Sequence, residues 1–131
     1  MSELFTQSVT IAPADIDELG HVNNTVYLRW AQDIATAHWR ARASAAMQAR
    51  YVWVATRHEI DYRASLELGD EAEARTWIED APRGPLWTRH VEIGKPGQRA
   101  AAELTSVWCL LDAATRKVKR VPPEMIQIFG A

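Results

Sequence analysis

The spacing of apolar residues changes once along the chain, near residue 50. Before that point, from Asn24 to about Arg50, apolar residues recur at alternating intervals of four and three, the period of one helix face. This apolar stripe comprises Tyr27, Ala31, Ile34, His38, Ala41 and Ala45, and the opposite face carries Arg29, Asp33, Thr36 and Arg40. The pattern predicts one long helix over residues 24–50 that buries one side and leaves the other in solvent.

The rest of the chain alternates between apolar and polar residues with a period of two, which indicates β-strands. The clearest case sets Ala72, Ala74, Thr76 and Ile78 against Glu71, Glu73, Arg75 and Trp77. Strands are predicted over residues 4–11, 52–63, 72–78, 86–93 and 100–111, with a short helix beginning at residues 122–124. The strand over 100–111 is apolar on both sides, so we expect it to be central and covered on both faces.

One strand, one long helix and then successive antiparallel strands predict an α+β fold, in which a five- or six-stranded sheet curls over the helix. The sequence has no internal repeat, low-complexity tract or linker. Its 131 residues, 47% of them hydrophobic, therefore predict a single domain over residues 1–131. Such a sheet leaves free edges above a small core, which favours pairing with a second copy.

Composition narrows the classes of function. A net charge of −2 gives no electrostatic case for binding nucleic acid. One cysteine, Cys109, excludes an intrachain disulfide and a cysteine-based zinc cluster. The first residues lack the features of a signal peptide, and no apolar run approaches the ~20 residues of a membrane span, so we predict a cytoplasmic protein without a membrane partner. Six tryptophans favour an apolar ligand pocket or a subunit interface.

Candidate chemistry gathers where the long helix is predicted to begin. Residues 15–30 read DIDELGHVNNTVYLRW, which places two aspartates and a histidine on a glycine-containing loop directly before the helix. Asn23 and Asn24 are good residues for capping a helix N-terminus. A helix start presents unpaired backbone N–H groups and the positive end of the helix dipole, so a developing oxyanion would be stabilised there.

This loop resembles the signature loop of hotdog-fold thioesterases, in the branch that contains 4-hydroxybenzoyl-CoA thioesterase and the acyl-carrier-protein thioesterases. Looser likeness at residues 60–63, 68–70 and 121–124 extends the resemblance over the whole chain. It implies one long central helix wrapped by a curved antiparallel sheet. It also implies hydrolysis of an acyl-CoA or acyl-carrier-protein thioester, with no cofactor and no metal, by a homodimer or homotetramer.

The resemblance also implies roles for the loop residues. Asp17 would attack the thioester or activate a water, and the backbone N–H of Asn24 would polarise the thioester carbonyl. His21 would orient Asp17 or carry a proton, although a histidine that only hydrogen-bonds the loop is an equal alternative. Acyl-carrier-protein thioesterases usually have asparagine where this chain has Leu19, and relatives often have an acidic residue where it has Gln32, so their full network is incomplete here.

Three further residues of this segment are expected to form part of the substrate site, whereas Asp15 is not. Gly20 would let the loop turn tightly enough to bring Asp17 before the helix start. Asn23 and Tyr27 are expected to contact the substrate beside it. Asp15 is expected to brace the loop.

Several other polar residues keep alternatives open. Asp33 is a rival carboxylate, because another hotdog branch takes its carboxylate from the central helix, although an ion pair with Arg29 one turn away is the simpler interpretation. His38 is expected to be a satisfied core histidine, and His58 and His90 lack the spacing of metal ligands. The basic run over residues 116–120 either guards an edge strand or meets the phosphates of coenzyme A. A non-catalytic acyl-CoA binding module and a hotdog dehydratase remain as other functions.

Overall fold

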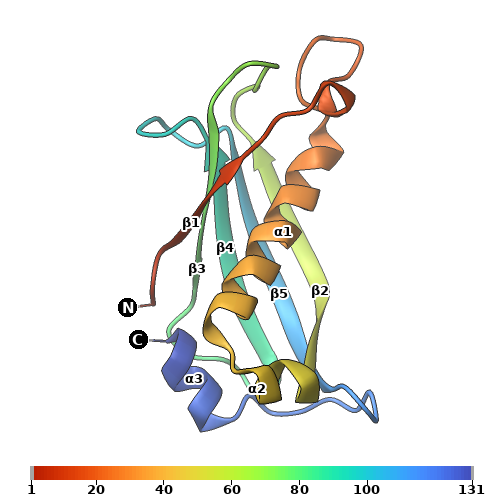
Figure 1. Ribbon diagram of the computed structural model, residues 1–131, viewed down its shortest axis with the longest axis vertical. Helices are drawn as coiled ribbons and strands as arrows, with labels where there is room; N and C mark the ends of the chain where they lie inside the picture. The colour runs from red at the N-terminus through yellow and green to blue at the C-terminus, as the bar shows by residue number, and fades with distance from the viewer. Residues whose placement is uncertain (1, 131) are drawn as a thin grey trace.

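A computed structural model describes residues 2–130 as an antiparallel sheet with helices on one face (Figure 1). Its strands are β1 (Phe5–Val9), β2 (Tyr51–Tyr62), β3 (Ala72–Ile78), β4 (Leu86–Gly94) and β5 (Ala102–Asp112). Its helices are the 3₁₀ turn η1 (Pro13–Asp15), α1 (Asn24–Arg42), α2 (Ala45–Arg50) and α3 (Pro123–Phe129). The five strands run in the order β1-β3-β4-β5-β2, so β1 and β2 are the edges. The predicted α+β arrangement is confirmed.

Alternation along the strands determines which side faces α1. In β3 the buried positions are Ala72, Ala74, Thr76 and Ile78, as the sequence pattern predicts. The other face of the sheet carries charged pairs, among them Arg75 with Glu92. Because one face packs and the other is polar, the sheet has a single covered side, which α1 crosses diagonally in Figure 1.

The core has two apolar parts. The first lies under the N-terminal half of α1 and includes Tyr27, Ile34, Val91 and Leu104. The second lies at the other end of the sheet, beside α3, and includes Trp87, Leu110, Met125 and Phe129. Four further buried side chains are polar, namely His38 on α1, Thr76 on β3, Arg89 on β4 and Ser106, which pairs with Arg89 across β4 and β5.

The predicted continuous helix over residues 24–50 is wrong, because the chain breaks at Ala43 and Ser44. Ala43 has an extended backbone, and the hydroxyl of Ser44 accepts a hydrogen bond from the N–H of Met47 at 3.1 Å, capping α2. Ala41 and Ala45, expected on the buried stripe, are exposed. The break turns the chain off the face of the sheet and into the edge strand β2.

Two expectations about the C-terminal half also need correction. Strand β5 is not covered on both faces, since Glu103, Thr105 and Val107 on its outer side are only partly buried. The basic run over 116–120 is not an edge strand either. It forms an exposed loop joined to β5 by one bridge, between Leu111 and Val118.

The exposed edge of the sheet is β2, twelve residues long and paired with β5 on one side only. A bulge between Ala55 and Arg57 interrupts its register. Val54 is 41% exposed in the strand. Long unpaired edges of this kind favour pairing with another strand. Within residues 2–130, no helix combines the length and apolar character that crossing a membrane requires.

Candidate active site

The loop before α1 closes into a small hairpin. Ile16 and Val22 form an antiparallel bridge, and the Asp17 N–H donates to the carbonyl of His21 at 2.9 Å. Gly20 completes a turn by donating to the carbonyl of Asp17 at 3.0 Å, with a φ of +83° that favours glycine. The Asp17 side chain is therefore held on a short ordered turn next to the start of the helix.

The Asp15 side chain supports this hairpin through hydrogen bonds, as predicted. Its carboxylate, 3% exposed, accepts hydrogen bonds from the N–H of Ala12 at 2.9 Å and from the guanidinium of Arg29 at 2.8 Å. Burial alone would raise the pKa of Asp15, but these two bonds outweigh it and hold the pKa below its usual value. The expected pair between Arg29 and Asp33 is wrong, because Arg29 reaches back to Asp15 and Asp33 lies exposed.

The start of α1 leaves one backbone donor free. Asn23 is the N-cap, and its side-chain oxygen accepts from the N–H of Thr25 at 3.0 Å. The Asn23 N–H donates to the Asp15 carbonyl and the Val26 N–H to the Asn23 carbonyl. Among residues 2–130, the Asn24 N–H has no hydrogen-bond acceptor, so it is available to a ligand.

The side chains of Asp17 and His21 do not touch in this structure. One carboxylate oxygen of Asp17 accepts from the N–H of Leu19 at 2.9 Å, which is an Asx turn. The imidazole of His21 instead lies 3.9 Å from the carboxylate of Glu67. Each side chain is partly exposed, and the other oxygen of Asp17 has no partner in the described part of the chain.

Tyr27 lies in the core behind this loop, 2% exposed. Its ring meets Trp30 and Tyr62 edge to face, with centroids 5.5 and 5.7 Å apart. Burial raises the pKa of the Tyr27 hydroxyl, which also has a hydrogen bond to the backbone of Leu66. Tyr62 donates to the carbonyl of Asn24 at 3.0 Å, so the end of β2 is tied to the start of α1.

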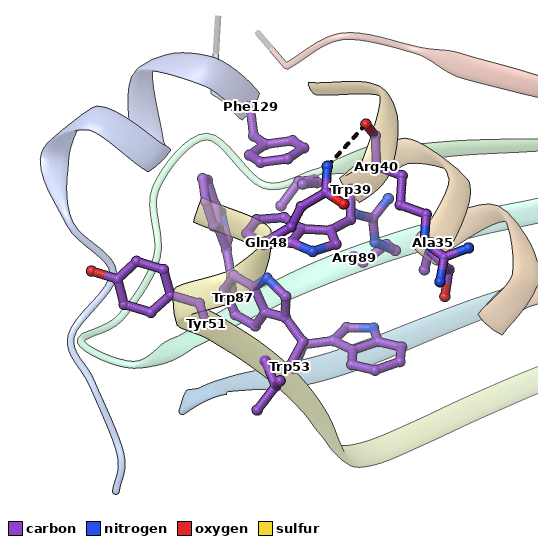
Figure 2. A pocket seen from close by; sticks show the side chains of 13 residues that line it. Ala35, Trp39, Arg40, Gln48, Tyr51, Trp53, Trp87, Arg89 and Phe129 are labelled. Atoms are coloured by element: carbon purple, nitrogen blue, oxygen red, sulfur yellow. Dashed lines mark hydrogen bonds between the residues drawn. The ribbon is translucent and has the colours of Figure 1, made fainter. Parts of the chain in front are cut away.

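A cavity of about 340 Å³ lies at the opposite end of α1 (Figure 2). Its walls come from the second half of α1, the start of β2, the inner faces of β4 and β5, and α3. Aromatic rings dominate the lining, which includes Trp39, Trp53, Trp87, Trp108 and Phe129. The predicted apolar pocket is therefore present, but far along the helix from Asp17.

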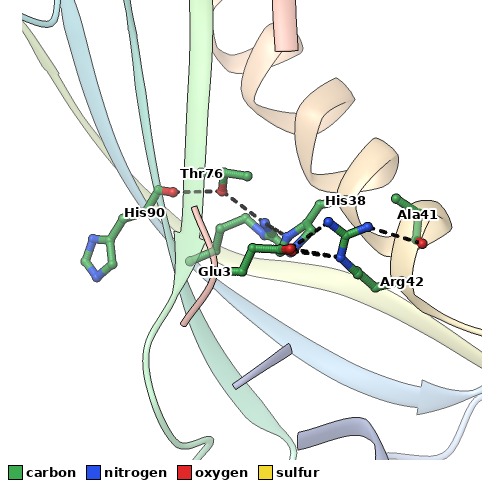
Figure 3. A network of polar contacts seen from close by, with 7 residues as sticks. Glu3, His38, Ala41, Arg42, Thr76 and His90 are labelled. Atoms are coloured by element: carbon green, nitrogen blue, oxygen red, sulfur yellow. Dashed lines mark hydrogen bonds and ion pairs between the residues drawn. The ribbon is translucent and has the colours of Figure 1, made fainter. Parts of the chain in front are cut away.

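A buried polar network borders this cavity (Figure 3). His38, with no exposed surface, hydrogen-bonds the Glu3 carboxylate through Nε2 and one Arg89 nitrogen through Nδ1, each at 3.0 Å. Since arginine can only donate, Nδ1 is the acceptor and a neutral His38 carries its proton on Nε2. Glu3 also pairs with Arg42 at 2.6 Å. His38 is thus the satisfied core histidine that the sequence predicts.

Sequence reasoning did not identify Arg89. Its guanidinium, 8% exposed, donates to His38 and, at 2.9 Å, to the hydroxyl of Thr76. Burial lowers the pKa of Arg89 to about 10, so it stays charged at neutral pH. A signal was available, because Arg89 falls on the apolar side of its strand together with Trp87, Val91 and Ile93.

Acidification is expected to destabilise the fold through His38. Burial, and then the charge of Arg89, lower the pKa of His38 to about 4, although Glu3 opposes them. Between about pH 4 and pH 6.5, His38 is protonated to a greater extent in the unfolded state than in the folded state. The free energy of unfolding therefore falls as the pH falls. The separation from about 6.5 to about 4 corresponds to at most about 3.4 kcal/mol of unfolding free energy, of which about 2 kcal/mol is lost by pH 5. Denaturant unfolding from pH 7 to pH 5 should show this loss, and a flatter dependence in His38→Gln. Parallel dependences would contradict it.

His58 and His90 hydrogen-bond nearby side chains. Nδ1 of His58 lies 2.6 Å from the hydroxyl of Ser106, and Nε2 of His90 lies 3.0 Å from the carboxylate of Glu79. Burial lowers the pKa of His58. Within the described ranges no group of three or more His, Cys, Asp or Glu side chains could hold a metal. The predicted absence of a metal and of a cofactor stays a prediction.

Comparisons with known proteins identify the family. A family model described as the thioesterase-like superfamily matches residues 11–129. A comparison with curated proteins gives no match. Among solved structures, a predicted thioesterase from Bacillus stearothermophilus is 23% identical, with a TM-score of 0.78 over 96% of this chain and 94% of that one.

Two further structures have names that mention coenzyme A. A thioesterase from Thermus thermophilus complexed with coenzyme A and Zn is 21% identical, with a TM-score of 0.83 over 96% of this chain and 97% of that one. A 1,4-dihydroxy-2-naphthoyl-CoA thioesterase from Synechocystis is 17% identical, with a TM-score of 0.76 over 92% and 90%. At these identities the likeness shows a shared fold.

The five-stranded sheet around one central helix is therefore a hotdog fold, as the sequence predicts. The family match covers most of the chain, and the protein belongs to the thioesterase-like superfamily. The class of reaction supported by this membership is the hydrolysis of a thioester.

Proposed function

We propose that the protein hydrolyses an acyl-CoA thioester to a free acid and coenzyme A at the hairpin before α1. The observation that carries the proposal is the free N–H of Asn24 at the start of a 19-residue helix, directly after the hairpin that holds the partly exposed Asp17. The N–H and the helix dipole would stabilise negative charge on the thioester oxygen. Family membership adds the reaction class.

Asp17 serves in one of two ways. As a nucleophile, a carboxylate oxygen bonds to the thioester carbon, the C–S bond breaks, and water then hydrolyses the resulting anhydride. As a general base, the carboxylate takes a proton from a water whose oxygen attacks the same carbon. In both cases the thiolate of coenzyme A leaves and takes up a proton, which His21, on the same hairpin, would supply. Gly20 and Asn23 shape the site through the turn and the cap.

Coenzyme A is the carrier we favour over acyl-carrier protein. The family membership and the coenzyme A named for the Thermus thermophilus structure support this choice. The exposed basic loop over residues 116–120 offers cations for the phosphates of the nucleotide.

We further propose that two copies pair through their β2 edges. In one chain the cavity begins at Ala35, eleven residues and about 16 Å along the helix from Asn24. When the β2 strands of two copies pair antiparallel about their midpoints, the end of β2 in one copy lies beside the start of β2 in the other. Tyr62, at the end, holds Asn24, whereas Tyr51 and Trp53, at the start, line the cavity. The helix start of one copy therefore comes beside the cavity of the other.

The experiment is thiol release from a panel of acyl-CoA esters with short, long and aromatic acyl groups, together with sedimentation to obtain the mass. Turnover by a species of at least twice the chain mass is expected. If no ester is hydrolysed but coenzyme A raises the melting temperature, the protein is a binding module. If an enoyl ester loses its double bond without releasing thiol, it is a dehydratase. A fully active monomer would overturn the β2 pairing.

A further inference from the structure

The charges around the aromatic cavity are of one sign. Among the residues that line it, Arg40 and Arg89 are cationic and none is acidic. Arg40 lies exposed at the rim, whereas Arg89 projects from β4 into the floor beside Trp39 (Figure 2). A buried cation in an aromatic enclosure is costly unless an anion or several acceptors face it.

The acceptors that face Arg89 satisfy one of its three nitrogens. Both of its hydrogen bonds, to His38 and to Thr76, come from Nη1. Among residues 2–130, no acceptor meets Nη2 or Nε, and no carboxylate pairs with the guanidinium. The nearest carboxylate in the network, that of Glu3, reaches Arg89 only through neutral His38 and is paired with Arg42. The fold thus leaves the remaining donors of Arg89 to the cavity.

A second donor in the cavity wall is also unused. The indole N–H of Trp108 is buried and has no hydrogen-bond partner in the part of the chain that the structure describes. Trp108 lines the same cavity as Arg89, but its Nε1 has almost no accessible surface, so the free donors that open onto the apolar space are those of Arg89.

We propose that the cavity receives the acyl group of the substrate, and that Arg89 binds a carboxylate at the far end of that acyl group. This inference rests on the proposed thioester hydrolysis and names its substrate class, the mono-thioester of a dicarboxylic acid. A cavity of about 150 Å³ holds benzene, so a cavity of about 340 Å³ accommodates an aromatic ring with a substituent, or a short alkyl chain. The aromatic walls favour the ring.

A charged acceptor fits this site better than a neutral one. The guanidinium group can donate two parallel hydrogen bonds to a carboxylate. A carboxylate therefore neutralises the buried charge of Arg89 and also accepts from its free N–H groups. The phosphates of coenzyme A are a poorer match, because a polar nucleotide would have to pass the indole rings to reach Arg89, which is 8% exposed.

The test compares matched thioesters that differ by one carboxylate: benzoyl-CoA with 4-carboxybenzoyl-CoA, and hexanoyl-CoA with adipoyl-CoA. The native protein should show a kcat/KM about tenfold to hundredfold higher for the carboxylated member of each pair. Arg89→Met should abolish this preference while retaining turnover of the neutral ester, and Arg89→Lys should restore part of it. Arg75→Met removes a cation from the outer face of the sheet and should keep the full preference.

Arg89→Gln removes the charge but keeps an amide N–H that can donate to His38 or Thr76, and serves if Arg89→Met does not fold. It should lower the preference several-fold. Equal kcat/KM for both members of each pair with the native protein would overturn the proposal. So would an Arg89→Met variant that keeps the preference, or one that loses affinity for free coenzyme A, because the cavity would then hold the nucleotide.

A binding measurement separates this inference from the proposed reaction. Calorimetry compares 4-carbamoylbenzoate, which carries a carboxylate opposite a neutral amide, with benzamide. If no thioester is hydrolysed but 4-carbamoylbenzoate binds in preference to benzamide and Arg89→Met removes that binding, the proposed reaction fails and the carboxylate site stands. If thioesters are hydrolysed and neither probe nor substrate shows the preference, the reaction stands and the carboxylate site fails.

Discussion

Thiol release by the Asp17→Asn variant is expected to fall by about 10²- to 10⁴-fold, the range that a positioned acid or base contributes. Asparagine keeps the shape of the side chain and an oxygen that can accept from the Leu19 N–H, so the Asx turn should survive. The amide is neither a base nor a nucleophile, so the chemistry alone is removed. The measurement is kcat with the best ester of the panel, beside coenzyme A affinity, which should not change.

Asp33→Asn is the matched control for this experiment. Asp33 is exposed on α1 and is the rival carboxylate, and its amide variant should keep native activity. If Asp33→Asn loses activity while Asp17→Asn stays active, the catalytic carboxylate is Asp33 on α1. If both variants are active, His21→Gln becomes the next variant to measure.

Ile34→Ala is expected to cost about 2–5 kcal/mol of unfolding free energy. Ile34 has no exposed surface and lies on α1 against the first part of the core. Truncation leaves a cavity that a helix fixed at one end by the Asp15 brace cannot fill by moving onto the sheet. Denaturant unfolding at several protein concentrations measures the loss and separates it from any effect of association.

Gln32→Ala, two residues away on the exposed side of the same helix, is the control. Surface substitutions of this kind change stability by no more than about 0.5 kcal/mol. Equal losses for the two variants would mean that α1 is not packed as described.

Period and local motif were enough to predict most elements. The alternation over residues 72–78 coincides with β3, because each of its side chains faces either the core or solvent. The end of the long helix could not be located, since no glycine or proline marks it. A serine N-cap starts a second helix instead, and serine is common in helices and loops alike.

The two parts of the site differ in how well the sequence predicted them. The hairpin with Asp17 and Asn24 is contiguous in sequence, so one motif was enough to predict a candidate site there. The network of Glu3, His38, Thr76 and Arg89 joins four segments that only the fold brings together. For the same reason Arg29 was assigned to Asp33, four residues away, whereas it pairs with Asp15, which the hairpin brings back to the helix.

The tryptophans give the protein a built-in optical reporter. Four of its six indoles line the cavity, and Trp53 lies 6.2 Å from Trp39 and 6.5 Å from Trp87 between ring centroids. At such separations excitation energy passes readily from one indole to the next, so quenching of one ring lowers the fluorescence of its neighbours as well. Intrinsic ultraviolet emission should therefore follow occupancy of the cavity directly, without any attached dye.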